Sequence, residues 1–196
     1  VSTPLSAQLF TYTIGTGTTS NAANAAPTPY GTYYANFRQQ YMYRATEITA
    51  AGGSAGFITR IGFNVQALNS CGNMTNFRIR MKNTTQVNLT ESFETGVYTE
   101  VWFQTTYRPL VTGWTSHTLT TPFYWDGASN LLIDILTDID GIARTQNASV
   151  YYTTTLMRTT SLRFQSITVP ASSAITGTTS SYRVNLQMIL MPLPPA

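Results

Sequence analysis

The chain has 196 residues, a formal net charge of +3 and 10% charged residues, against about 25% in an average soluble domain. This length accommodates one sizeable hydrophobic core, and the 11 basic residues are scattered instead of forming the block that marks a nucleic-acid-binding tail. The sequence has no run of about 20 apolar residues, so we expect neither nucleic-acid binding nor membrane insertion.

The predicted elements are almost all strands, because runs with a period of two alternate with turns rich in Gly, Pro and Asn. In chain order, we expect strands over residues 9–14, 40–48, 57–66, 76–84, 97–107, 114–120, 131–136, 150–155, 161–169 and 182–190. Residues 15–29 are small and polar and end in proline, which predicts a long loop. Residues 191–196 are Pro-rich and are expected to leave the last sheet, because proline cannot donate a ladder hydrogen bond.

This succession of strands without helices predicts an all-β fold of two packed antiparallel sheets. We interpret residues 1–196 as a single β-sandwich domain with an extended N-terminal segment, 1–29, and a Pro-rich C-terminal exit, 191–196. A jelly roll fits the number of strands best, and an immunoglobulin-like sandwich is the alternative.

The strand over residues 76–84 shows the clearest alternation. Three apolar side chains should point inward and three basic ones outward: Phe77, Ile79 and Met81 against Arg78, Arg80 and Lys82. We interpret the basic row as a solvated strand face, with an anion-binding patch as the alternative. Residues 131–136 are apolar on both faces except Asp134, which is typical of a central strand.

The sequence offers little for catalysis, so we expect no enzyme. His117 is the single histidine, and no Gly-x-Ser-x-Gly motif marks a nucleophile. We interpret His117 as a residue on a strand face, sharing that face with Leu119. A glycoside hydrolase would need two carboxylates that flank a cleft. The sequence has eight acidic residues but no pattern that brings two of them together, so a glycoside hydrolase stays a lesser alternative.

Asp138 and Asp140 form the one acidic pair of metal-site type, followed directly by Gly141. Calcium takes six to eight oxygen ligands, so two aspartates fall short of a calcium loop. The competing interpretation is a turn in which aspartate caps its own backbone. We therefore expect no cofactor and keep calcium at Asp138 and Asp140 as a candidate. One histidine and one cysteine disfavour zinc.

An aromatic cluster around residues 30–43 contains the candidate ligand-binding residues. Tyr41 and Tyr43 share a strand face and are expected in the core. Tyr33 and Tyr34 lie in a predicted loop, where exposed rings stack on sugars or anchor protein contacts. Tyr33 and Tyr34 are therefore the candidate glycan-binding residues.

Several stretches resemble a recurring module of large secreted surface proteins of Bacteroidota, which the type IX system exports. They are Tyr43-Arg-Ala-Thr-Glu-Ile, Gly56-Phe-Ile-Thr-Arg-Ile-Gly-Phe-Asn-Val, Phe77-Arg-Ile-Arg-Met-Lys, Gly113-Trp-Thr-Ser-His-Thr-Leu-Thr-Thr-Pro-Phe-Tyr-Trp-Asp-Gly-Ala-Ser-Asn-Leu-Leu-Ile and Gly177-Thr-Thr-Ser-Ser-Tyr-Arg. The resemblance covers most of the chain and implies an extracellular or cell-surface setting. The module has no assigned activity, so it implies no catalytic residue.

The resemblance also implies a cysteine in the strand around Leu136 that pairs with one near Cys71. Here position 136 is leucine and Cys71 is the single cysteine. This departure puts a stabilising disulfide in doubt, or leaves Cys71 for an intermolecular bond.

Carried over, the resemblance implies adhesion, display or the building of a surface filament. We hypothesise a self-assembling subunit of a bacterial surface fibre or layer, whose partners are copies of itself or other surface proteins. Segment 1–29 would reach a neighbour and add a strand to its sheet; Val1, Leu5, Leu9 and Cys71 are the candidate assembly residues. The alternatives are a carbohydrate-binding module, a glycoside hydrolase and a viral capsid jelly roll, against which the family stretches argue.

Overall fold

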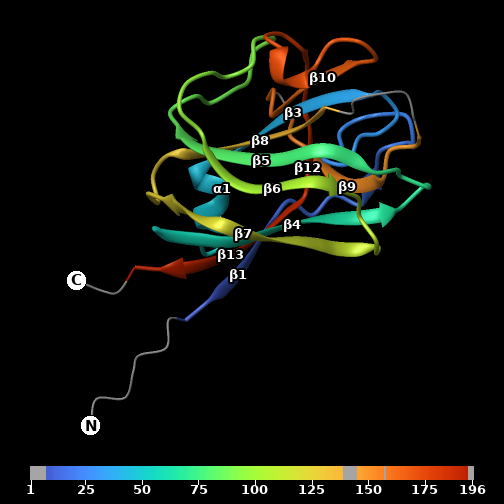
Figure 1. Ribbon diagram of the computed structural model, residues 1–196. Coiled ribbons are helices and arrows are strands. Elements are labelled where there is room, and N and C mark those ends of the chain that lie inside the picture. Colours follow the sequence, from blue (N-terminus) through green and yellow to red (C-terminus); the bar gives the residue numbers. More distant parts are fainter. Residues whose placement is uncertain (1–7, 139–144, 157, 194–196) are drawn as a thin grey trace.

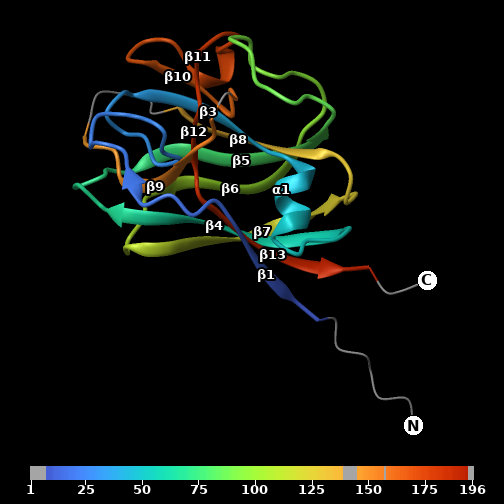
Figure 2. The same cartoon turned by 180° about the vertical axis from the view of Figure 1, so that it is seen from behind.

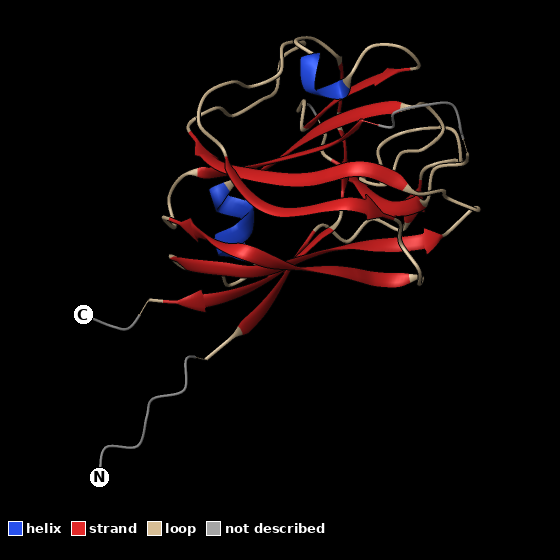
Figure 3. Cartoon of the chain, viewed as in Figure 1, coloured by secondary structure: helices blue, strands red, loops and turns tan. Residues whose placement is uncertain are grey.

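Two antiparallel sheets pack face to face in the computed structural model, which describes residues 8–138, 145–156 and 158–193 (Figure 1). The strands are β1 (Phe10–Ile14), β2 (Thr19–Ser20), β3 (Asn36–Tyr43), β4 (Gly56–Ala67), β5 (Met74–Thr84), β6 (Thr99–Tyr107), β7 (Gly113–Trp125), β8 (Asn130–Asp138), β9 (Ser149–Thr154), β10 (Ser161–Ser166), β11 (Thr178–Ser180), β12 (Tyr182–Val184) and β13 (Leu186–Pro192). Two short helices, α1 (Ala45–Ala50) and the 3-10 helix η1 (Ala171–Ser173), accompany them (Figure 3). Neither helix is long and apolar enough to cross a membrane.

The strand order is that of a jelly roll. One sheet contains the neighbours β1-β13-β4-β7, and the other contains β3-β8-β5-β6. Consecutive strands such as β4 and β5, or β6 and β7, lie in opposite sheets, as the nested Greek keys of a jelly roll require. The predicted fold class is therefore confirmed. Strands β2, β9 and β12 extend the first sheet, and β10 and β11 extend the second.

The main core lies between the two sheets and follows the predicted alternation. Phe77, Ile79 and Met81 of β5 are fully buried there, as expected. Opposite them, β4 contributes Ile61 and Phe63, both with no exposed surface. Each side chain of this kind stabilises the fold by about 1.5–3 kcal/mol through its burial.

A second, smaller core covers the outer face of the β3-β8-β5-β6 sheet. Leu89 and Phe93, from the connection between β5 and β6, pack there against Met42 and Leu132. The expected solvated face of β5 is therefore wrong: the side chains of Arg80 and Lys82 point outward but are only 27% and 17% exposed. Alternation predicts the direction of a side chain, but not whether the connection that follows the strand folds back over that face.

The predicted strand over residues 40–48 is also partly wrong, because β3 ends at Tyr43 and α1 begins at Ala45. The Glu47 carboxylate accepts the backbone N–H of Arg44 at 2.9 Å, as in a helical capping box. Arg183 of β12 donates to both carboxylate oxygens of Glu47, at 2.7 and 2.9 Å, and so fixes the helix on the sandwich. These long-range contacts stabilise a helix that has no helical periodicity of its own.

β1 and β13, the first and last strands, run side by side in opposite directions at one end of the molecule (Figures 1 and 2). The C-terminal exit was predicted to begin at residue 191, but β13 continues to Pro192. Met191 and Pro192 still pair with Phe57 and Gly56 of β4. A terminal proline is tolerated because the ladder stops there.

Candidate functional site

The free edge of β1 is the first candidate for a contact site. β1 pairs with β13 on one side, and no strand among the described residues pairs with its other side. Phe10 is 37% exposed, while Thr11 and Thr13 present their side chains to solvent. The sequence carries no charged residue before Arg38, so this edge bears no charge.

Two residues position β1. Ile14 is buried in the main core and anchors the inner end of the strand. Gly15 follows with φ of +92°, where a Cβ would lie 2.6 Å from Oδ1 of Asn185. Only glycine adopts this conformation without strain and without that close approach. The strand is thus held at its inner end, and its edge is left open.

A polar hollow, the side pocket, lies where β10 and β11 extend the second sheet. It has a volume of about 200 Å³ and is lined by the Ala26-Pro27 segment and by side chains that include Gln39, Ser161, Arg163, Thr178 and Tyr182. Arg163 faces Gln39 of β3 on one side and Thr178 of β11 on the other. Residues opposite one another on neighbouring strands project to the same face, so these three polar groups converge.

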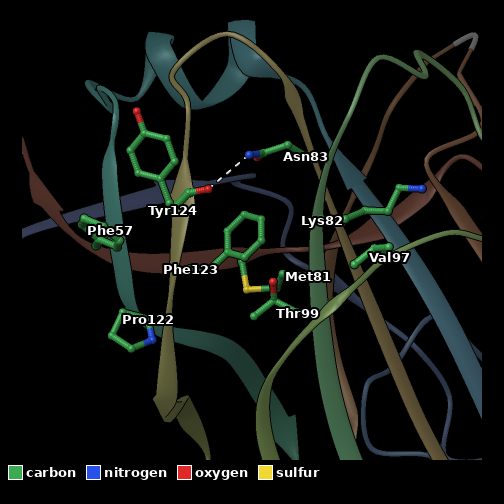
Figure 4. A pocket seen from close by; sticks show the side chains of 9 residues that line it. All are labelled: Phe57, Met81, Lys82, Asn83, Val97, Thr99, Pro122, Phe123 and Tyr124. Atoms are coloured by element: carbon green, nitrogen blue, oxygen red, sulfur yellow. Dashed lines mark hydrogen bonds between the residues drawn. The ribbon is translucent and has the colours of Figure 1, made fainter.

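A wider hollow, the end groove, has a volume of about 430 Å³ and lies between the ends of β5 and β7 (Figure 4). Its floor is apolar, since Phe123 and Met81 point toward each other across it, whereas Phe57 and Tyr124 point away (Figure 4). The cation at its rim, Lys82, is already paired with Glu94 at 3.2 Å. The end groove is therefore a concave surface with few polar groups free to bind a ligand.

His117 lies on a strand face with Leu119, as expected, and that face is the core. Its Nε2 is 2.9 Å from the hydroxyl of Tyr30, and Trp102 packs against the ring with the centroids 4.6 Å apart. Burial lowers the pKa of His117 to about 3, so the ring is neutral at ordinary pH. Because the His117 ring is buried, a substrate cannot contact it in the folded chain.

The carboxylates are engaged in structural contacts. Asp134 has no exposed surface, and its oxygens accept hydrogen bonds from Nε of Arg38 at 2.8 Å and Nε of Arg80 at 2.9 Å. Burial opposes ionisation of Glu47, but the hydrogen bonds and charge of Arg183 outweigh it and lower its pKa. The other pairs or caps are Glu94 with Lys82, Glu100 with Arg78, Asp126 with the N–H groups of Ala128 and Ser129, and Asp138 with that of Ala171. Among the described acids, Glu91 alone is exposed without such a contact.

The candidate calcium ligands are not brought together by the described structure. Asp138 accepts hydrogen bonds from the backbone N–H groups of Ala171 and Ser172 at η1. It therefore caps a backbone segment, as in the competing interpretation, but this segment is η1 and not the turn that contains Asp138. Asp140 lies outside the described residues. Within the described ranges, no group of three or more acidic, histidine or cysteine side chains is arranged to hold a metal ion.

Tyr33 and Tyr34 lie together on a loop, as expected, and are half-buried. Their rings meet at 74° with the centroids 5.2 Å apart. The buried side chain of Asn147 fixes the loop, because its Oδ1 accepts the N–H groups of Thr32 and Tyr33 at 2.8 and 2.9 Å. The two tyrosines line neither hollow, so the structure places them apart from both candidate cavities.

Cys71 is buried, and the expectation that it is available for an intermolecular bond is wrong for the folded chain. Its sulfur lies 3.5 Å from Oγ1 of Thr32 and 3.7 Å from the carbonyl of Tyr30. Burial raises the pKa of the thiol, which keeps it protonated and unreactive. A partner could reach it only after this part of the core had opened.

The N-terminal segment differs from the expected free arm. Leu9 is 56% exposed beside β1, while Val1 and Leu5 lie outside the described residues. From Phe10 onward the segment packs on its own chain: β1 pairs with β13, β2 pairs with β9, and residues 27–30 are buried. Residues 10–29 are therefore not a free arm, and the exposed part of the strand is its edge.

The sequence missed the side pocket because its residues come from distant parts of the chain. Gln39, Arg163 and Thr178 lie in strands that pair only in the folded sheet. The one indication in the sequence was Arg163, within the predicted strand over residues 161–169, and a single arginine does not predict a binding site. The free edge of β1 had a clearer signal in the uncharged, β-branched and aromatic run of residues 9–14.

Comparisons with known proteins support the fold. No protein-family model matches the sequence, and a search of curated proteins finds no match. Among solved structures, the chain is similar to a part of the clostridial cysteine protease Cwp84 after propeptide cleavage, with a TM-score of 0.52 and 8% sequence identity. The match covers 94% of this chain and 40% of the protease chain, so this chain spans less than half of it. At this identity the likeness concerns the fold alone.

Proposed function

We propose that this chain is a non-catalytic extracellular structural or adhesive module, and that it assembles with copies of itself through the free edge of β1. The observation that carries the proposal is that this edge is open, uncharged and lined by aromatic and β-branched residues. An edge of this kind is a template for pairing with another strand.

The other edges of the two sheets carry the features by which proteins avoid such pairing. β6 has a charge at Glu100, and β7 has Pro122. β11 and β12 are three residues long. β1 has neither charge nor proline over five residues, so it is the least protected edge of the described structure.

Pairing across a two-fold axis fits the geometry of β1. In an antiparallel pair centred on Tyr12, each Phe10 would lie opposite Ile14 of the second copy, and Thr11 opposite Thr13. The two β1-β13-β4-β7 sheets would then form one continuous sheet across the dimer. A two-fold contact closes at two subunits, so the dimer is the building unit, and a fibre or layer adds a second contact.

The non-catalytic part of the proposal is supported by the side chains that catalysis would need. His117 is sealed in the core, and the described carboxylates other than Glu91 are engaged in ion pairs or caps. The extracellular part is supported by the charge-poor composition and by the resemblance to the Bacteroidota surface module.

The test is the oligomeric state of the chain, measured by light scattering across a concentration series. We expect dimers or larger assemblies for the natural sequence and monomers for Thr11→Lys/Thr13→Lys, because both changes lie on exposed positions and bring lysines opposite one another in the pair. Thr16→Lys/Thr18→Lys is the matched control, since it adds the same charge at exposed positions just beyond the strand.

A monomeric natural chain at every concentration would refute self-assembly. Dimers that persist in Thr11→Lys/Thr13→Lys would place the contact elsewhere. If the control variant also became monomeric, added charge in general, and not the β1 edge, would explain the effect.

A further inference from the structure

The side pocket has the polarity of an anion site. Arg163 is the single charged residue that lines it, and no lining residue is acidic. Among the described residues, Arg163 takes part in no ion pair. A guanidinium that faces a hollow without a carboxylate leaves its hydrogen-bond donors for a ligand.

The neighbours of Arg163 add further donors. Gln39 is 1% exposed, and its Oε1 accepts the backbone N–H of Thr28 at 3.2 Å. This contact orients the amide so that Nε2 is the end without a partner among the described residues. Thr178 contributes a hydroxyl from the opposite strand. Three donors from three strands thus converge, and the backbone ladders hold their spacing.

The rim of the pocket supplies an aromatic surface. Tyr182 is 42% exposed, and its ring lies 4.9 Å from that of Tyr152, at an interplanar angle of 30°. The C–H-rich face of a sugar ring packs on such an aromatic face. The volume of about 200 Å³ is smaller than the roughly 300–1,000 Å³ of pockets for drug-sized ligands, which suits a single ring.

We propose that the side pocket binds an acidic sugar, a uronic acid residue, with its carboxylate on Arg163 and its ring against Tyr182. The planar guanidinium matches the two oxygens of a carboxylate in a bidentate pair. Gln39 and Thr178 then donate to the remaining oxygens. This site is separate from the β1 edge, so it stands whether or not the chain assembles.

The test is a calorimetric titration of the full chain at low salt with three probes: glucuronate, glucose and acetate. We expect glucuronate to bind about tenfold or more tightly than either other probe, because glucose lacks the charge-assisted pair and acetate lacks the ring. Arg163→Gln should weaken glucuronate binding about tenfold or more and leave glucose unchanged.

The matched control is Arg60→Gln, which removes the same charge from an exposed position on β4 and should leave the affinity for glucuronate unchanged within about twofold. If Arg163→Gln lost its folded circular dichroism spectrum, Tyr182→Ser would carry the test, with the same expected weakening for glucuronate and no effect on acetate.

Three results would overturn the proposal. They are equal affinities for glucose and glucuronate, equal affinities for acetate and glucuronate, and no loss of glucuronate binding in Arg163→Gln. A natural chain that bound no glucuronate at millimolar concentrations would overturn it as well. Each of these results leaves the oligomeric state untouched, so failure of this site and failure of the β1 contact are told apart.

Discussion

Replacing Asp134 by asparagine removes the one negative charge from a buried ionic cluster. The carboxylate has no exposed surface and lies between two arginines, with 2.8 Å to Nε of Arg38 and 2.9 Å to Nε of Arg80. The side chain of Arg38 is 9% exposed and packs under the ring of Phe93, 4.2 Å from its centroid. In Asp134→Asn, the Arg38 guanidinium stays in this buried site without a counter-charge.

Breaking a buried ion pair in this way costs about 3–5 kcal/mol, because one charge is left desolvated and unpaired. That is a large part of the roughly 5–15 kcal/mol that stabilises a domain. The assay is urea unfolding followed by tryptophan fluorescence, from which the free energy of unfolding is extrapolated. We expect Asp134→Asn to lower it by about 3 kcal/mol or more.

Two further variants serve as comparisons for the effect of Asp134→Asn on the free energy of unfolding. Glu100→Gln breaks the ion pair between Glu100 and Arg78, whose side chains are 44% and 35% exposed, respectively. This change should lower the free energy of unfolding by at most about 1 kcal/mol. Arg38→Met/Asp134→Leu removes the two buried charges and leaves Arg80, whose side chain is 27% exposed and within reach of solvent. It should recover much of the loss, because apolar replacements of a buried pair are often neutral. The reasoning is refuted if Asp134→Asn costs no more than Glu100→Gln.

The pKa of His117 falls to about 3 in the folded chain, so the unfolded chain binds more protons below pH 6.5. The free energy of unfolding should therefore fall with decreasing pH, by up to about 1.4 kcal/mol per pH unit. Unfolding measured at pH 6.5 and pH 5 should show this slope, and His117→Phe should flatten it. Cys71 should not react with a thiol reagent in the native chain and should react fully in urea, as an absorbance assay would record, whereas fast native labelling would contradict its burial. Gly15→Ala should cost about 1–3 kcal/mol in thermal unfolding. The loss should exceed that of Gly113→Ala, because both glycines have positive φ but only at position 15 would the added Cβ meet neighbours within 4 Å, namely Asn185 and Thr153; equal losses would show that these contacts contribute nothing.

Strand β5 has the side-chain directions that its sequence predicts, because a single local period decides them. The inward row Phe77, Ile79 and Met81 could be read from alternation alone, because neighbouring side chains of a strand project to opposite faces. The prediction of a strand over residues 40–48 failed after Tyr43, because Ala45–Ala50 form α1. There a carboxylate cap and the distant Arg183 outweigh the weak local preference for a strand.

The candidate site could be predicted only in part. Tyr33 and Tyr34 were correctly placed on a loop and do lie together, yet they line neither the side pocket nor the end groove. The free edge of β1 could be anticipated from its uncharged run, but its openness depends on β13, which joins it from the other end of the chain. A lone cysteine is equally compatible with a surface thiol and a buried one, and packing against Thr32 decides for the second.

The fold class, the direction of the side chains of β5 and the absence of charge along the first strand can be predicted from the sequence, because each follows from local residue order. Which strands become neighbours depends on long-range packing, and so does the sharing of a pocket, a buried ion pair or an open edge by side chains from distant strands. Strand pairing joins residues more than 100 positions apart, such as Gln39 and Arg163, and no local period records such a contact.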